Sequence, residues 1–160
     1  MSVALKGLLG GTTATVLSTS EIGGLTNNSK VIGATVYDNT AGSGISSTSG
    51  DGYVRGMFIF TPGGTFGGAP TANTGIDIYC IKSIDGGTTY EGGSTTYAPI
   101  GSYVGTLPLQ PSTAVADNIV MREFFVPACK WKVLAVNNAT GQTIPTSSTI
   151  KYTPSTDEGV

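Results

Sequence analysis

The chain has 160 residues, a length typical of one domain, and only 11% of its residues are charged. The 8 basic and 10 acidic residues give a net charge of −2, and the lysines and arginines are scattered, so the sequence lacks the basic cluster that nucleic-acid binding requires. Histidine is absent, which excludes a Ser-His-Asp or Cys-His catalytic arrangement and histidine ligands for zinc.

The first segment, residues 1–12, is apolar but is interrupted by Lys6, so it lacks the long hydrophobic core of a signal peptide. Its apolar side chains would be costly to leave in water, and we expect an arm that contacts a partner or a first edge strand. The candidate contact residues of this arm are Val3, Leu5, Leu8 and Leu9. Apolar runs elsewhere are far shorter than the ~20 residues that span a membrane, so no membrane partner is expected.

From residue 13 to residue 153 the sequence predicts short strands and no long helix. Alternating or β-branched runs are separated by turn residues, and the 24 glycines and 8 prolines oppose long helices. The predicted strands are residues 13–18, 30–37, 53–61, 75–84, 118–126, 130–137 and 149–153. We expect the strand at 53–61 to be central, with a bulge or a close backbone contact at Gly56.

Alternation assigns the side chains of two of these strands to faces. In 75–84, Ile76, Ile78 and Cys80 share one face, and Asp77, Tyr79 and Ile81 share the other. In 130–137, Trp131, Val133 and Ala135 share one face, and Lys130, Lys132 and Leu134 share the other. The pattern predicts an all-β domain of two packed antiparallel sheets, and its long connections favour a jelly roll over an immunoglobulin-like sandwich. Residues 154–160 are expected to form a C-terminal tail.

Three long polar intervals are expected to be ordered surface loops or excursions from a sheet edge. They are residues 39–52, 62–74 and 88–102. In the last of them, Tyr90, Tyr97 and Ile100 are expected to provide anchoring.

The two cysteines, Cys80 and Cys129, lie in or beside predicted strands and are interpreted as small buried thiols. The alternatives are a bond between them across the sandwich and a metal or redox site. The last alternative has no CxxC motif or histidine to support it. No metal and no cofactor are therefore expected.

The ten acidic residues are mostly placed in loops and at strand ends, where turn formation and solvation account for them. They are Glu21, Asp38, Asp51, Asp77, Asp85, Glu91, Asp117, Glu123, Asp157 and Glu158. A glycosidase-like carboxylate pair is an alternative, because such a pair needs no histidine. A loop calcium site at Asp38-Asn39 or Asp51-Gly52 is another, although no EF-hand spacing is present.

The segment from Ser83 to Tyr90, SIDGGTTY, resembles an Asp box, with Tyr90 in the aromatic position. We interpret it as a stabilised hairpin, in which Asp85 accepts hydrogen bonds from nearby N–H groups and Gly86-Gly87 adopt positive φ. The aromatic residues could alternatively form a sugar-stacking platform, although aromatic residues of β proteins more often lie in the core. The candidates are Tyr37, Tyr53, Tyr79, Tyr90, Tyr97, Tyr103 and Trp131.

The C-terminal half resembles a family of small virion structural proteins of tailed bacteriophages. The resemblance rests on four segments: IDIYCIKSIDGGTTY from Ile76, IGSYVGTLPL from Ile100, VMREFFVPACKWKVLAVNN from Val120 with the following Thr140-Gly141-Gln142, and TIKY from Thr149. One of its motifs implies an apolar strand near 100–109. Cys129 and Thr153-Pro154 depart from the family pattern, and the N-terminal half carries no diagnostic residue.

The resemblance implies a β-sandwich head protein that decorates or cements the capsid surface. Such a protein would associate as a homotrimer, bridge major capsid subunits, and reside on the virion after synthesis in the host cytoplasm. We therefore expect a non-catalytic structural protein. The alternatives are a neck, tail or fibre-associated virion protein, a carbohydrate-binding module and, from the acidic residues alone, a glycosidase.

Overall fold

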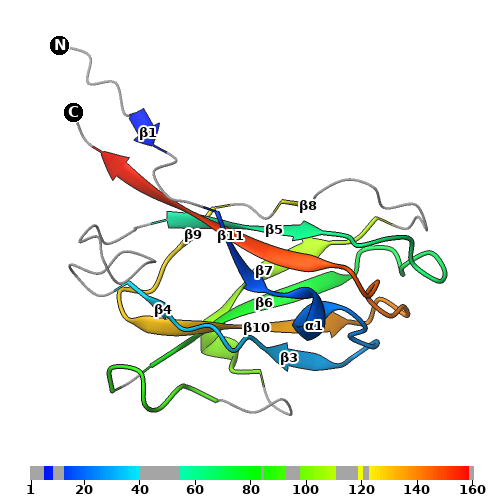
Figure 1. Ribbon diagram of the computed structural model, residues 1–160, viewed down its shortest axis with the longest axis horizontal. Helices are drawn as coiled ribbons and strands as arrows, with labels where there is room; N and C mark the ends of the chain where they lie inside the picture. Colours follow the sequence, from blue (N-terminus) through cyan, green and yellow to red (C-terminus); the bar gives the residue numbers. More distant parts are fainter. Residues whose placement is uncertain are drawn as a thin grey trace.

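The computed structural model describes residues 6–8, 13–39, 55–83, 85–92, 98–110, 119–120 and 123–158. Its elements in chain order are β1 (Lys6–Leu8), β2 (Ala14–Leu17), α1 (Thr19–Ile22), β3 (Lys30–Ile32), β4 (Tyr37–Asp38), β5 (Arg55–Thr61), β6 (Gly75–Lys82), the 3₁₀ turn η1 (Ile100–Ser102), β7 (Tyr103–Pro108), β8 (Ile119–Val120), β9 (Phe124–Phe125), β10 (Lys130–Asn138) and β11 (Thr149–Glu158). The strands form two antiparallel sheets that pack face to face, which confirms the predicted all-β sandwich (Figure 1).

The first sheet has the order β1-β11-β5-β8, with β2 also paired to β11 and β9 also paired to β5. The second sheet has the order β3-β10-β6-β7, with β4 also paired to β10. The pairing is nested along the chain: β2 pairs with β11, β3 and β4 with β10, β5 with β8 and β9, and β6 with β7. The chain therefore runs like one long hairpin that is folded over on itself.

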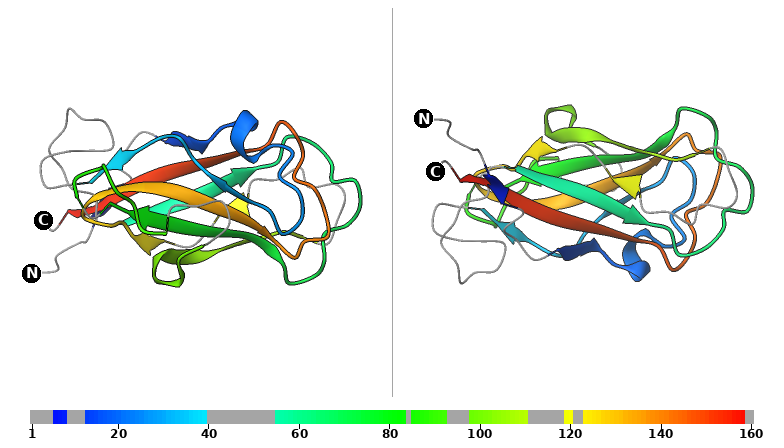
Figure 2. Two further views of the ribbon diagram at one scale, coloured as in Figure 1. Left: turned by 90° about the horizontal axis from the view of Figure 1, so that it is seen from below. Right: turned by 90° about the horizontal axis from the view of Figure 1, so that it is seen from above.

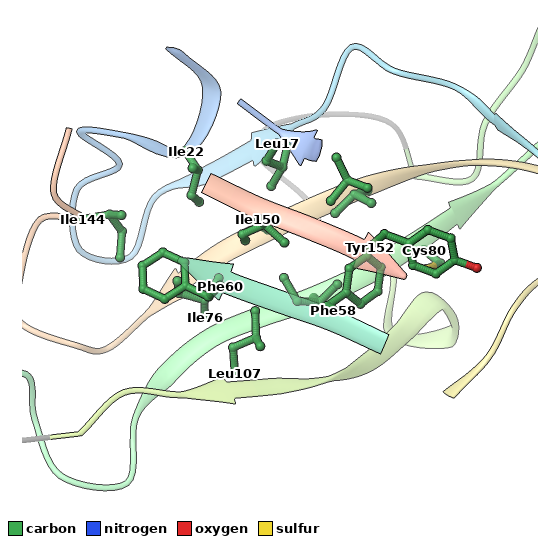
Figure 3. Close-up of a cluster of buried hydrophobic side chains, with 14 of the residues drawn as sticks. Leu17, Ile22, Phe58, Phe60, Ile76, Cys80, Leu107, Ile144, Ile150 and Tyr152 are labelled. Carbon is green, nitrogen blue, oxygen red and sulfur yellow. The ribbon is translucent and has the colours of Figure 1, made fainter. Parts of the chain in front are cut away.

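The core lies between the sheets and is built by alternation, as the sequence predicts. On β5, Phe58 and Phe60 are fully buried, and they face side chains of the second sheet (Figure 3). The predicted inward faces all belong to this core: Ile76, Ile78 and Cys80 of β6, and Trp131, Val133 and Ala135 of β10. Burial of each large apolar side chain contributes roughly 1.5–3 kcal/mol to folding, so this core is the main source of stability.

Gly56 is required by the aromatic part of the core. Trp131 stacks on Tyr37 at 4.7 Å between ring centroids and meets the ring of Tyr152 edge-on at 5.3 Å. A Cβ at position 56 would lie 2.3 Å from a ring carbon of Tyr152. The predicted close contact at Gly56 is therefore confirmed, and it is a contact with a side chain of the neighbouring strand.

The outer face of the second sheet carries a smaller cluster of buried apolar side chains. Ile81, Leu134 and Val136 form it, and Ala98 packs against it from the β6–β7 connection. Because that connection covers part of the sheet, both faces of β6 are buried. Ile100 was expected to anchor the connection, but it is 86% exposed, so that expectation is wrong. Tyr97 lies outside the described residues.

Two predicted strands are each divided in two. The strand predicted at 30–37 becomes β3 and β4, because the N–H of Ala34 donates to Oε1 of Glu21 (2.8 Å) and not to the ladder on β10. The strand predicted at 118–126 becomes β8 and β9, which both pair with β5. β7 was absent from the strands predicted by alternation, although the family resemblance implied an apolar strand there.

β11 continues past Thr153 to Glu158, into residues that the sequence assigned to a tail. Its partners explain the extension, since Ser155 still pairs with Arg55 of β5, and residues 156–158 pair with β1. Leu8 of the predicted arm is therefore in an edge strand. The arm residues Val3, Leu5 and Leu9 lie outside the described part of the chain.

At one end of the sandwich, three loops are joined by hydrogen bonds (Figures 1 and 2). These are residues 18–29, 62–74 and 139–148, and we call this region the amide end. The fully buried Asn137 is at its centre: its Nδ2 donates to the carbonyls of Leu25 (3.0 Å) and Gln142 (2.7 Å), and its Oδ1 accepts from the hydroxyl of Thr140. Each polar group of this side chain is thus satisfied within the chain.

Candidate functional site

At the opposite end, β1 and the last residues of β11 project beyond the rest of the first sheet (Figure 1). Arg55, the first residue of β5, pairs with Ser155 on one side and with Phe125 of β9 on the other. We call Arg55, Glu123, Phe124 and Phe125 the terminal edge. The register of the sheet places this edge next to the strands that carry both chain ends.

The two phenylalanines of β9 point in opposite directions. Phe124 stacks on Phe58 of the core at 4.8 Å, whereas Phe125 is 76% exposed. The guanidinium carbon of Arg55 lies 5.6 Å from the centre of the Phe125 ring, and Nη1 of Arg55 lies 3.2 Å from Oε2 of Glu123. These residues line a hollow of about 90 Å³. The result is an exposed aromatic ring beside an ion pair.

This arrangement is suited to binding, and its one carboxylate, that of Glu123, is paired with Arg55. Aromatic residues and arginine are enriched at the centres of protein interfaces, and a surrounding polar rim helps to exclude water. Neither Arg55 nor Phe125 was among the functional residues predicted from the sequence. A signal was available, because adjacent residues of a strand point to opposite faces, so one of two neighbouring phenylalanines must face outward when the other is in the core.

The predicted hairpin is formed at the same end of the second sheet. Oδ1 of Asp85 accepts from the N–H groups of Thr89 (2.6 Å) and Thr88 (3.0 Å), and Gly86 and Gly87 have φ values of 73° and 113°. The hydrogen bonds from Thr89, then Thr88 and Ser83, lower the pKa of Asp85. The hairpin interpretation is confirmed: the carboxylate is occupied in holding the turn.

The two cysteines are free thiols, with Cys80 buried and Cys129 half-buried. The structure therefore does not form the bond that was considered between them. Burial raises the pKa of the Cys80 thiol far above its usual range, and burial also raises that of Cys129. Both thiols are consequently held in the protonated, weakly nucleophilic form at neutral pH.

The acidic side chains are dispersed. Glu91 accepts from Ser102, Asp38 lies 3.6 Å from Nζ of Lys130, and Glu123 is paired with Arg55. Asp77 lies within β6 on the face that alternation predicts for it, together with Tyr79 and Ile81, and it is buried there. Asp51 and Asp117 lie outside the described residues. Within the described ranges, no three acidic or cysteine side chains gather closely enough to hold a metal ion.

Of the aromatic residues considered for sugar stacking, some lie in the core and others lie on the surface. Tyr37 and Trp131 are buried in the core, and Nζ of Lys132 lies over the ring of Tyr90 at 4.9 Å. Tyr79 and Tyr103 meet on the outer face of the second sheet, with ring centroids 5.3 Å apart. Tyr53 and Tyr97 lie outside the part of the chain that the structure describes.

Comparison with protein-family models, with curated proteins and with solved structures gives no match for this chain. None of the helices in the described residues is long and apolar enough to cross a membrane.

Proposed function

We propose that this chain is a non-catalytic structural protein of a tailed-phage particle, and that it decorates the head by bridging neighbouring subunits of the shell. The observation that carries the proposal beyond the sequence resemblance is the terminal edge, where Phe125 is 76% exposed beside the Arg55–Glu123 pair. An aromatic ring held in this way is an anchor for another protein surface.

We further infer that the sandwich is a jelly roll and not an immunoglobulin-like sandwich. The nested strand pairing supports a jelly roll. The first sheet contains the pair β2–β11 and the pairs of β5 with β8 and β9, and the second sheet contains the pairs of β10 with β3 and β4 and the pair β6–β7. Immunoglobulin-type sheets instead have the strand orders ABED and CFG. Jelly rolls are frequent in viral capsids and also in lectins, so this likeness in fold raises the expectation of a virion role without establishing one.

The chemistry of the surface fits attachment through many modest contacts. With only 11% charged residues, copies of the chain experience little mutual repulsion at close range. A homotrimer would present the terminal edge three times, and simultaneous engagement of several shell subunits would then raise the overall affinity without any new contact. A neck, tail or fibre position is the alternative placement in the particle.

The test is binding of the purified chain to particles of the phage that carries its gene, prepared without this chain. The wild-type chain is expected to sediment with the particles, and Phe125→Ala is expected to weaken binding at least tenfold, equivalent to about 1.4 kcal/mol per engaged site. Ile100→Ala is the matched control, because Ile100 is an apolar side chain on the turn η1, away from the terminal edge, and is 86% exposed. Failure of the wild-type chain to bind would overturn the proposal.

The predicted arm is tested separately by deletion of residues 1–12. If the arm contributes Val3, Leu5, Leu8 and Leu9 to the contact, the deletion weakens binding further than Phe125→Ala does. Undiminished binding would show that the arm is not an anchor and that the terminal edge acts alone.

A further inference from the structure

We propose that Tyr79, Tyr103 and Ile100 form a binding surface for an uncharged saccharide on the outer face of the second sheet. This would be a binding activity in addition to the structural role, and it rests on residues away from the terminal edge.

A β-bulge creates the surface. Ile78 pairs with Gly105 and Tyr79 pairs with Tyr103, so one additional residue of β7, Val104, is accommodated between these pairs. Val104 packs against the core, whereas Tyr103 faces outward and is 49% exposed. The bulge thus redirects one side chain, which is a frequent use of bulges next to functional sites. It places the Tyr103 ring beside that of Tyr79, at 5.3 Å and with an interplanar angle of 60°.

Hydrogen bonds fix the Tyr103 ring. The Thr106 hydroxyl donates to Oδ1 of Asp77, so its only proton is committed. The hydroxyl of Tyr103, 2.7 Å from Oγ1 of Thr106, must then be the donor in that bond. Nδ2 of Asn138 donates to Oδ2 of Asp77 at 2.7 Å. A polar chain of Tyr103, Thr106 and Asp77 therefore holds the tip of an exposed ring, and the ordering of that ring does not have to be supplied by a ligand.

The exposed groups indicate the class of ligand. Tyr103 is 49% exposed, and Ile100, three residues before it on the turn η1, is 86% exposed. Tyr79 is half-buried against the outer apolar cluster and leaves part of its ring open beside Tyr103. The polar side chains bonded to this surface, Thr106 and the exposed Asn138, are uncharged, while Asp77 is buried with both oxygens accepting hydrogen bonds. Lys132 of β10 shares this face, but its Nζ lies over the ring of Tyr90. A pyranose ring has an apolar C–H face and a rim of hydroxyl groups, which matches this combination. A phosphate or nucleic acid would be better matched by a cluster of lysines or arginines.

The size of the surface also favours a sugar over a second copy of the chain. A stable protein interface buries about 800 Å² on each partner, whereas an aromatic side chain supplies about 150–250 Å². Two tyrosines and one isoleucine fall below that requirement, but they are sufficient for one or two sugar rings.

The experiment is saturation-transfer NMR of the full chain with uncharged tetrasaccharides of glucose, galactose and mannose, followed by titration of any that bind. We expect transfer to at least one of them, a loss of at least tenfold in affinity for Tyr103→Ala, and a smaller loss for Tyr103→Phe, which keeps the ring but removes its anchoring hydroxyl. The Phe125→Ala variant, which lacks an exposed aromatic ring of the other sheet, should bind the saccharide as the wild type does.

Ile100→Ala provides a second variant should Tyr103→Ala fail to fold, because Ile100 is almost fully exposed on the turn η1, and it is expected to weaken binding severalfold. The absence of transfer to all three saccharides, or binding that none of these surface variants changes, would overturn the proposal. Concentration-dependent self-association lost in Tyr103→Ala, without sugar binding, would also overturn it and would identify the surface as a contact between copies.

Discussion

The amide end and the terminal edge lie at opposite ends of the same sandwich, and they differ in whether a central side chain is satisfied within the chain or left exposed (Figures 1 and 2). At the amide end, the donors and the acceptor of the Asn137 side chain are bound within the chain. At the terminal edge, Phe125 is left 76% exposed. Polar groups that are already satisfied have little to offer a partner, whereas an exposed ring gains from being covered. We therefore expect the amide end to contribute mainly to the stability of the fold and the terminal edge to contribute to contact with a partner.

The largest expected effect is that of Asn137→Ala. The substitution removes two donors and one acceptor from a fully buried position, so that the Leu25 carbonyl, the Gln142 carbonyl and the Thr140 hydroxyl each lose one hydrogen bond. We expect the free energy of unfolding to fall by roughly 3 kcal/mol, measured by urea denaturation. The control is Asn27→Ala at the same end, which loses one exposed hydrogen bond to the N–H of Gly141 and should cost less than about 1 kcal/mol. Equal effects would remove the distinction between the buried and exposed amides.

The neighbouring phenylalanines of β9 are expected to differ in their contribution to the free energy of unfolding, because one faces the core and the other faces solvent. Phe124→Ala removes the ring stacked on Phe58 and should lower the unfolding free energy by roughly 2–3 kcal/mol. Phe125→Ala should change it by no more than about 0.5 kcal/mol, because its ring is mostly in water. A Phe125→Ala variant that unfolds as easily as Phe124→Ala would show that the outward ring is part of the fold.

Gly56→Ala tests how tightly the inner side of the terminal edge is packed. The added Cβ would meet the buried ring of Tyr152 at 2.3 Å, and we expect destabilisation of about 2 kcal/mol in the same urea assay. Gly101→Ala is the matched control, since nothing lies within 4 Å of the Cβ that it adds. A tolerated Gly56→Ala would mean that the ring can move and that the core is looser here than at the amide end.

The smallest effect is expected from Glu21 at the amide end. Partial burial raises its pKa, but hydrogen bonds from the N–H of Ala34 and from the N–H and hydroxyl of Ser18 outweigh this, and the pKa is lowered overall. A lowered pKa in the folded state stabilises the protein above the unfolded glutamate value of about 4.3, and this stabilisation is lost as the pH falls through the folded value.

The wild type should therefore be more stable than Glu21→Gln at pH 7, by less than about 1 kcal/mol because the half-buried side chain is still screened by solvent, and the difference should vanish towards pH 3. Urea unfolding at the two pH values measures it. A difference that persists unchanged at low pH would indicate that the charge of Glu21 is not the cause.

Much of the fold follows from local rules that a sequence displays. Alternation placed Ile78 and Val133 in the core correctly, because a strand has a period of two whatever its neighbours are. The contact at Gly56 and the turn held by Asp85 were also predicted, since each depends on residues close in sequence or on the lack of a side chain.

The remaining features depend on contacts between distant residues. β3 and β4 are separated because the N–H of Ala34 donates to Glu21, and the buried amide of Asn137 is bonded to two connections that are distant in sequence, at Leu25 and at Gln142. The outward ring of Phe125 and the pairing of Tyr79 with Tyr103 likewise depend on strand register and on one bulge. The sequence indicated Tyr79 and Tyr103 among several candidate stacking residues, but alternation within a single strand does not determine which aromatic side chains meet.

The most direct test of the central claim is the copy number of this chain in purified phage particles, determined by quantitative mass spectrometry against the shell subunit. A protein that attaches to the shell through its terminal edge should be present in numbers of the same order as the shell subunit, and particles carrying Phe125→Ala should contain far fewer copies. A count of only a few copies per particle, or equal incorporation of the Phe125→Ala variant, would contradict the account.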